Sequence, residues 1–344
     1  MDLRTKLRST GLLQAIGNTP IIKIQSLSRI SGCEIFMKCE NLNPGGTIKD
    51  RPALHMVVEA IVRGDLKPGM TIVEGTAGNT GIGLAMVGQA LGYKVIVVMP
   101  EGMAVEKHKV LKLYGAEIVE TAACAYSDER HFFKVGKKIG TSRPDYWWAN
   151  QFDNPDNYMS HYLTTGPEIY KQMDGKIDAV VLASGSGGQA AGISKYMKEK
   201  NPKIQIVVPD PMGSGIANYF EHGQFDSDGK YTMTEGVGIT RLVENYKHIQ
   251  QDRCYTIDDQ KIQYLANFVR KEEGLVMGMS SMLNLAGAFN TALRGGKGQR
   301  IITCLNDGGE RAMSKMYNPE FLKEKGIKND LLSENEITEI FRAL

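Results

Sequence analysis

The sequence predicts an α/β protein with two open, mostly parallel sheets and helices on both faces. One pattern recurs along its 344 residues: an apolar, β-branched run, a glycine-rich turn and a stretch of helical character. Continuous apolar runs are typical of strands buried on both faces, and helices between them favour parallel βαβ units. Right-handed crossovers would place the loops after these strands at one sheet edge, where α/β proteins bind ligands.

The first group of predicted elements lies between about residues 45 and 150. Residues 71–74 (TIVE) predict a strand, GTAGNTG a turn, IGLAMVGQALG a helix, and residues 94–100 (KVIVVMP) the next strand. Residues 144–157 (PDYWWANQFDNPDN) are turn-rich and aromatic. We interpret them as the crossing to the second sheet.

The second group lies between about residues 165 and 310. Residues 178–183 (DAVVLA) predict a strand that leads into SGSGG, the helix QAAGISKYMKEK and a strand over 204–210 (IQIVVPD). Residues 300–305 (RIITCL) predict another strand, followed by the turn NDGGE and a helical stretch, RAMSKM.

These groups predict a division into domains. We expect residues 1–44 and 151–330 to form a larger domain and residues 45–150 a smaller one. Residues 331–344 are expected to form a C-terminal tail helix, because Ser333 and Glu336 have the spacing of a capping box.

Bulk composition excludes several classes of partner. Hydrophobic residues make up 42% of the chain and charged residues 23%, with a formal net charge of +2. Such a balance gives no electrostatic reason to expect nucleic acid or membrane as a partner. No apolar run approaches the roughly 18 residues of a membrane span, and Gly11–Ile16 is too short for a signal-peptide core. The five cysteines include no CxxC pair and no metal motif is present, so we expect a reducing, cytoplasmic location and no metal.

Three glycine-rich loops follow predicted strands. SGSGGQAAG can bring backbone N–H groups and a helix N-terminus to a phosphate, although it also fits a dinucleotide fingerprint with Asp210 as the acidic residue. GTAGNTG lacks the lysine of a Walker loop and is sized for a carboxylate, although a capped helix start is an equal interpretation. NDGGE by itself indicates only a turn.

Lys49 closes the stretch NPGGTIK and decides between these interpretations. A pyridoxal phosphate enzyme needs a lysine for a Schiff base, a phosphate cup and a site for the substrate carboxylate. The loops and Lys49 supply all three. An NAD enzyme would use the SGSGG loop but leave Lys49 and GTAGNTG unexplained.

The motifs together resemble one family. NPGGTIKDR, EGTAGNTGIGLA, NQFDNP, HYLTTGPEI, SGSGGQAAG, TEGVGI, GMSS and DGGER occur in the order and spacing of the cysteine synthase and cystathionine β-synthase family, the fold-type II pyridoxal phosphate enzymes. The resemblance covers about residues 10 to 325. Within the family, the sequence is most similar in its motifs to bacterial cysteine synthase (O-acetylserine sulfhydrylase)-like proteins.

The resemblance implies a set of site residues. Lys49 resembles the Schiff-base lysine that also removes the Cα proton, and Asn79 the partner of the cofactor's phenolic oxygen. The implied phosphate cup is Gly185, Ser186, Gly187 and Gly188, and the implied substrate contacts are Thr76, Ala77, Gly78, Thr80, Gln151 and Gly236.

The chain departs from the family pattern at three places. Ala77 stands where the family usually has a serine, which removes one hydroxyl from the carboxylate loop. Gly308 stands where the family places a serine opposite the pyridine nitrogen, and we expect Asp307, Asn306 or a water to replace it. Gln189 stands where the family usually has a threonine touching phosphate.

The implied activity is pyridoxal phosphate-dependent β-replacement on an activated L-serine. We expect O-acetyl-L-serine and sulfide to give L-cysteine and acetate through an aminoacrylate intermediate, in a homodimer whose partners are small molecules. L-cysteine, O-phosphoserine or homocysteine as substrate would instead give lyase, dehydratase or cystathionine synthase behaviour. An alternative of another class is a cofactor-binding sensor or scaffold with weak turnover, which Ala77 and Gly308 motivate.

Overall fold

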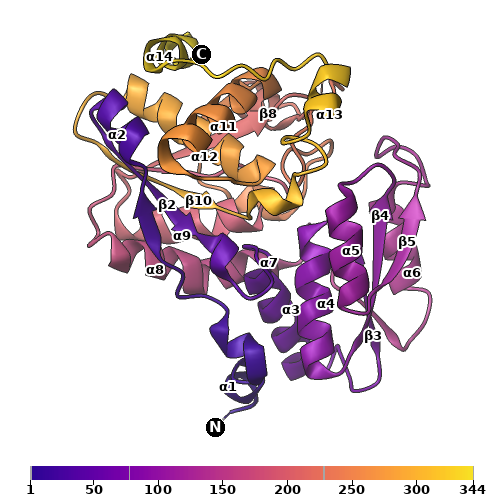
Figure 1. Ribbon diagram of the computed structural model, residues 1–344. Coiled ribbons are helices and arrows are strands. Elements are labelled where there is room, and N and C mark those ends of the chain that lie inside the picture. The colour runs from indigo at the N-terminus through magenta and orange to yellow at the C-terminus, as the bar shows by residue number, and fades with distance from the viewer. Residues whose placement is uncertain (1, 77, 228, 344) are drawn as a thin grey trace.

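The structure, a computed structural model, describes residues 2–76, 78–227 and 229–343. Its strands form a six-stranded sheet of order β1-β2-β10-β7-β8-β9 and a four-stranded sheet of order β5-β4-β3-β6 (Figure 1). All neighbouring strands run parallel except β1 and β2. The strands are β1 (Ile21–Lys23), β2 (Glu34–Cys39), β3 (Thr71–Gly75), β4 (Lys94–Pro100), β5 (Glu117–Thr121), β6 (Tyr146–Trp148), β7 (Ala179–Val181), β8 (Gln205–Pro211), β9 (Arg253–Ile257) and β10 (Arg300–Leu305).

Helices connect the strands. The α-helices are α1 (Leu3–Arg8), α2 (Gln25–Ser31), α3 (Asp50–Arg63), α4 (Asn79–Leu91), α5 (Val105–Leu113), α6 (Phe132–Gly140), α7 (Pro155–Ser160), α8 (Gly166–Gln172), α9 (Gly188–Lys200), α10 (Ile216–His222), α11 (Asp259–Glu273), α12 (Met279–Arg294), α13 (Pro319–Glu324) and α14 (Glu334–Arg342). Short 3₁₀ or π segments are η1 (Gly11–Ala15), η2 (Glu40–Leu42), η3 (His161–Thr165), η4 (Asn245–His248) and η5 (Gly309–Arg311).

The four-stranded sheet is buried on both faces. Along β4, Val97 and Met99 belong to a core cluster built with residues of α3 and α4, whereas Ile96 and Val98 belong to a cluster with residues of α6. Alternate side chains of a strand point to opposite faces, so an unbroken apolar run is what a doubly covered strand requires.

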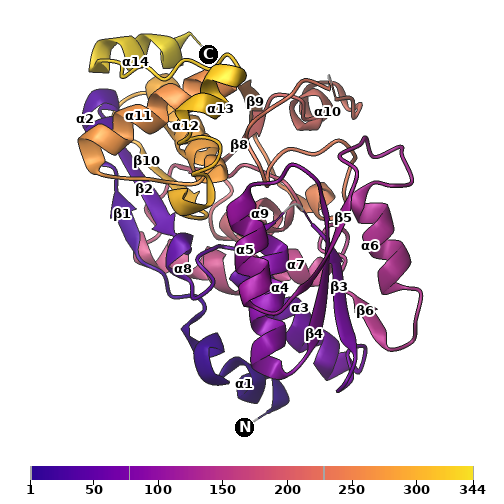
Figure 2. The ribbon, with the colours of Figure 1, turned by 45° about the vertical axis from the view of Figure 1, so that its right-hand side comes forward.

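The six-stranded sheet is covered in the same way. In β10, Ile301 packs in the cluster formed by α2, α11, α12 and α14, while Ile302 packs in the cluster formed by α8 and α9. The C-terminal helix α14 lies outside α11 and α12 (Figure 2) and buries Ile337 and Phe341. Its capping box between Ser333 and Glu336 forms as predicted.

The predicted fold class and the strands over 94–100 and 300–305 are confirmed. The helix predicted over RAMSKM (residues 311–316) is wrong, because these residues form only the end of η5, a bend and turns. The side chain of Arg311 is held by Asn79 and that of Ser314 by Glu106, so tertiary contacts override local propensity. Residues 144–157 also contain an unpredicted edge strand, β6.

The thiols of all five cysteines are free. Within the described ranges, no helix is both long and apolar enough to cross a membrane.

Candidate active site

A cavity of about 350 Å³ lies where the carboxyl ends of strands from both sheets meet. Its walls come from the segments after β3, β6, β7 and β10, together with the segment before α3. Loops at the carboxyl ends of parallel strands are the usual ligand-binding position in α/β proteins. The βαβ pattern predicts this position without any motif.

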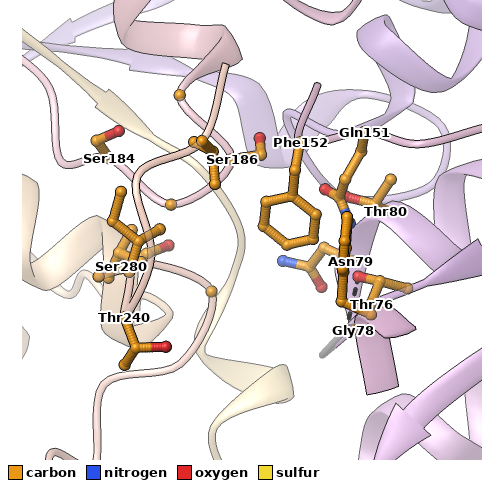
Figure 3. A pocket seen from close by; sticks show the side chains of 18 of the residues that line it. Thr76, Gly78, Asn79, Thr80, Gln151, Phe152, Ser184, Ser186, Thr240 and Ser280 are labelled. Carbon is orange, nitrogen blue, oxygen red and sulfur yellow. Dashed lines mark hydrogen bonds between the residues drawn. The ribbon is translucent and has the colours of Figure 1, made fainter. Parts of the chain in front are cut away.

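Most of the predicted site residues line this one cavity. Figure 3 shows Thr76, Asn79, Thr80 and Gln151 on one side and Ser184, Ser186, Thr240 and Ser280 on the other, with the ring of Phe152 between them in this view. The predicted residues in the lining are Lys49, Thr76, Gly78, Asn79, Thr80, Gln151, Gly185, Ser186, Gly187 and Gly236. Ala77 lies outside the described residues, and neither Gly188 nor Asp307 is among the described residues of the wall.

The Pro-Gly-Gly turn places Lys49 at the cavity. Gly46 adopts a positive φ of 74°, and its N–H donates to the Asn43 carbonyl at 2.8 Å, which closes the turn. The next residues dock on the end of β10: Ile48 N–H donates to the Asn306 carbonyl at 2.9 Å, and Thr47 forms a β-bridge with Asp307. The backbone is therefore fixed at Lys49, which is the N-cap residue of α3.

Buried charges hold the start of α3 against the six-stranded sheet. Arg51 donates from Nε to Glu40 at 2.7 Å and from Nη1 to Glu168 at 2.7 Å. Glu168 also pairs with the buried ammonium of Lys38 at 2.8 Å. Removing one partner of such a pair leaves an uncompensated buried charge, so the network fixes the position of the helix that follows Lys49.

The cavity changes the chemistry of the Lys49 amine. Burial lowers the pKa of Lys49 to about 8, and the nearby carboxylate of Asp307 acts in the opposite direction. With this pKa, Lys49 loses its proton far more readily near physiological pH than an ordinary lysine, and the neutral form can act as a nucleophile towards a carbonyl group and as a proton acceptor. The turn therefore gives this lysine its location, and burial there gives it the protonation behaviour that a Schiff base requires.

Asn79 is fixed at the N-terminus of α4 by two charged groups. Its Nδ2 donates to Asp307 Oδ2 at 2.7 Å, and its Oδ1 accepts from Arg311 Nη1 at 2.8 Å. Asp307 is itself fixed in place. Its carboxylate accepts from Asn79, and its backbone carbonyl accepts from Ser281 Oγ at 3.0 Å. Asp307 is thus engaged with Asn79, and its predicted contact with a pyridine nitrogen stays a prediction.

The segment after β3 presents small donors to the cavity. Gly78 N–H lies 3.3 Å from Thr76 Oγ1, and Thr80 Oγ1 donates to Gln151 Oε1 at 2.6 Å. The Thr80 bond joins the loop after β3 to the loop after β6. Hydroxyl, amide and backbone N–H groups of this kind suit a carboxylate.

The loop after β7 has the features of a phosphate cup. Gly187 has a positive φ of 84°, and a Cβ there would lie 2.6 Å from the Tyr246 nitrogen. The first backbone N–H groups of α9 follow directly and have no acceptor within the helix. Ser186 Oγ accepts from Asn157 Nδ2 at 3.1 Å, whereas the buried Ser184 Oγ at the cavity has no partner among the described atoms.

Several residues of the wall were not among the predicted site residues. Arg241 stacks over the Phe133 ring at 4.2 Å from its centroid and pairs with Asp153 at 3.1 Å. Phe133 and Phe152 meet edge to face at 5.6 Å. Lys107 also lines the cavity. These groups come from separate segments, so only the fold brings them together.

Comparison with known proteins gives the family. The family described as "Pyridoxal-phosphate dependent enzyme" matches residues 12–307, and the chain belongs to it. "Cysteine synthase 1" of Neurospora crassa is 40% identical over 322 residues, covering 92% of this chain and 85% of that protein.

Solved structures agree. The O-acetylserine dependent cystathionine beta-synthase from Helicobacter pylori aligns with a TM-score of 0.82 at 31% identity, over 89% of this chain and 97% of that one. O-Acetyl Serine Sulfhydrylase isoform 3 from Entamoeba histolytica aligns with a TM-score of 0.83 at 30% identity, over 96% and 95% of the two chains.

The residues present fit pyridoxal phosphate, the cofactor of this family. The unpartnered Ser184 hydroxyl and the N-terminus of α9 offer donors for a phosphate, and Lys49 offers an amine with a lowered pKa for an aldehyde. Asn79 lines the same cavity. The site can therefore hold the cofactor while the loop after β3 remains free for a carboxylate.

Proposed function

We propose that this chain is a cysteine synthase that replaces the acetoxy group of O-acetyl-L-serine with sulfide, giving L-cysteine and acetate. The observation that carries the proposal is the position of Lys49 in one cavity with a phosphate-type loop and a carboxylate-type loop. The relatives named cysteine synthase support the choice of substrates.

The protein's own residues would act in a fixed order. Thr76 and Thr80, which follow β3, bind the substrate carboxylate together with Gln151, which follows β6, and orient the Cα–H bond towards Lys49. The Lys49 amine accepts the Cα proton, acetate leaves from Cβ, sulfide forms the new C–S bond there, and Lys49 returns the proton to Cα to complete L-cysteine. Bound pyridoxal phosphate supplies the electron sink for the negative charge that develops at Cα. Asn79, held by Asp307 and Arg311, would hold the cofactor's phenolic oxygen.

A second candidate is that the nucleophile is a thiol amino acid, which would give cystathionine or a related thioether. One part of the cavity wall favours this candidate: it consists of Tyr126, Phe133, Phe152 and Arg241. It offers an apolar surface and a guanidinium group, which a thiol amino acid could use and which sulfide does not need. One solved relative is named for a reaction of this type.

Product analysis with the purified holoenzyme separates the candidates. O-acetylserine is supplied with sulfide, with homocysteine, or with both at equal concentration, and the products are quantified by mass spectrometry. Cysteine as the dominant product under competition supports the proposal. Dominant cystathionine would transfer the assignment to the second candidate, and a bound cofactor without turnover of either pair would support a sensor.

We also propose that the two sheets belong to two domains, residues 1–44 with 151–330 and residues 45–150, that close on substrate and exclude water from the site. A homodimer in the cytoplasm is proposed from the family resemblance, and the free cysteines fit a reducing compartment. Light scattering coupled to size-exclusion chromatography tests the dimer.

A further inference from the structure

Lys107 is a buried cation beside the loop expected to bind the substrate carboxylate. It belongs to α5, lines the cavity and has only 4% of its surface exposed. A Cβ at Gly78 would lie 2.6 Å from Lys107 Cδ and 3.0 Å from its Nζ. The ammonium therefore lies directly against the loop between Thr76 and Thr80.

Glu235 is the partner of Lys107, and it has other partners too. Its carboxylate pairs with Lys107 and also with Lys315 at 2.6 Å, and it accepts from Ala104 N–H at 3.3 Å. The neighbouring acid of α5, Glu106, accepts from Ser314 Oγ at 2.8 Å. Two ammonium groups thus share the Glu235 carboxylate. If Lys107 turned towards an anion in the cavity, Glu235 would keep Lys315 and would not become an unpaired buried charge.

The carboxylate loop lacks a formal charge of its own. Thr76, Thr80 and Gln151 offer neutral groups, and Ala77 supplies no hydroxyl. Hydrogen bonds between an ionised donor and a carboxylate are about twice as strong as those between neutral groups. We propose that Lys107 binds the α-carboxylate of the amino-acid substrate, exchanging its contact with Glu235 for that carboxylate; this assignment rests on the proposed function.

Binding of two ligands that differ only in the carboxylate tests the assignment. L-serine and L-serinamide are titrated into the holoenzyme by calorimetry, for the wild type, Lys107→Met, Lys107→Arg and Lys109→Met. Lys109 is an exposed lysine of the same helix and is the matched control. We expect Lys107→Met to weaken serine binding tenfold or more, which is on the order of the loss of one charge-assisted hydrogen bond. Serinamide binding should weaken less than about twofold. Lys107→Arg should restore most of the serine affinity, and Lys109→Met should change neither.

The Glu235→Gln variant distinguishes carboxylate binding from a purely structural role, in which the Lys107–Glu235 ion pair acts as a latch that joins the two sheets. A latch would make Lys107→Met and Glu235→Gln equivalent, since both break the same ion pair. Carboxylate binding predicts that Glu235→Gln leaves serine affinity unchanged or tighter. Equal losses for serine and serinamide in Lys107→Met, or matching defects in Lys107→Met and Glu235→Gln, would overturn the assignment. A wild-type holoenzyme that binds neither ligand would instead refute the proposed function.

Discussion

Replacing Lys49 with methionine is expected to stabilise the apoprotein while removing the point of cofactor attachment. Burial lowers the pKa of Lys49 from its ordinary value of 10.5 to about 8, so at pH 7 the folded protein holds an ammonium where charge is disfavoured. At about 1.36 kcal/mol per pKa unit, the whole effect is about 3 kcal/mol. We expect a gain of about 2 kcal/mol, because the side chain is partly exposed to the cavity and solvent screens it.

This gain should shrink as pH rises. Between pH of about 8 and 10.5 the unfolded chain still holds the proton that folded Lys49 has released, so wild-type stability rises with pH in this window. The methionine variant has no such group. The difference in unfolding free energy should therefore fall to below about 1 kcal/mol at pH 10.

Urea unfolding of the two apoproteins, followed by the fluorescence of Trp147 and Trp148, measures the difference at pH 7 and pH 10. A shift of the midpoint without a change in slope reports stability alone. Lys109→Met is the control for loss of an exposed lysine. An unchanged or less stable Lys49→Met apoprotein at pH 7, or a gain independent of pH, would refute the idea that the cavity disfavours the ammonium.

Three further perturbations test other parts of the structure. Burial raises the pKa of Glu74 to about 8, so wild-type stability falls as pH rises towards 8. The stability advantage of Glu74→Gln, measured by chemical denaturation, should therefore grow by about 3 kcal/mol between pH 5 and pH 8. Phe341→Ala removes a fully buried ring that contacts Phe289 and should cost about 3–5 kcal/mol by the same assay, with activity per folded molecule retained. Asp307→Ala frees the Asn79 amide and should weaken pyridoxal phosphate binding about tenfold in an equilibrium titration; unchanged spectra and turnover would leave Asp307 without a role at the cofactor.

The sequence predicts the parts of the fold that rest on uninterrupted apolar runs. The strands over 94–100 and 300–305 are buried on both faces, and this is the condition under which the pattern is unambiguous. The short edge strand β6 is only half buried and lies among turn-forming residues, so it carries no such pattern. The helix expected after NDGGE fails because Arg311 and Ser314 are held by side chains distant in sequence.

The candidate site divides in the same way. Lys49 and the glycine loops are predictable, because each combines a turn, a strand end and a helix start within a few residues. Lys107 is not, because its position depends on how α5 packs against the loop around Gly78 and on Glu235 from a segment more than a hundred residues away. Asp307 also illustrates the limit: the family resemblance suggests a place for it beside the cofactor, but its bond to Asn79 depends on side-chain geometry.

The most direct test of the central claim is the visible absorption spectrum of the purified protein and of Lys49→Ala, each with pyridoxal phosphate, then with O-acetylserine, and then with sulfide. The account predicts a visible cofactor band in the wild type that shifts with O-acetylserine and returns with sulfide as cysteine forms, and neither response in the variant. A colourless protein that pyridoxal phosphate cannot reconstitute, or a variant that responds as the wild type does, would contradict the assignment of Lys49 and the function built on it.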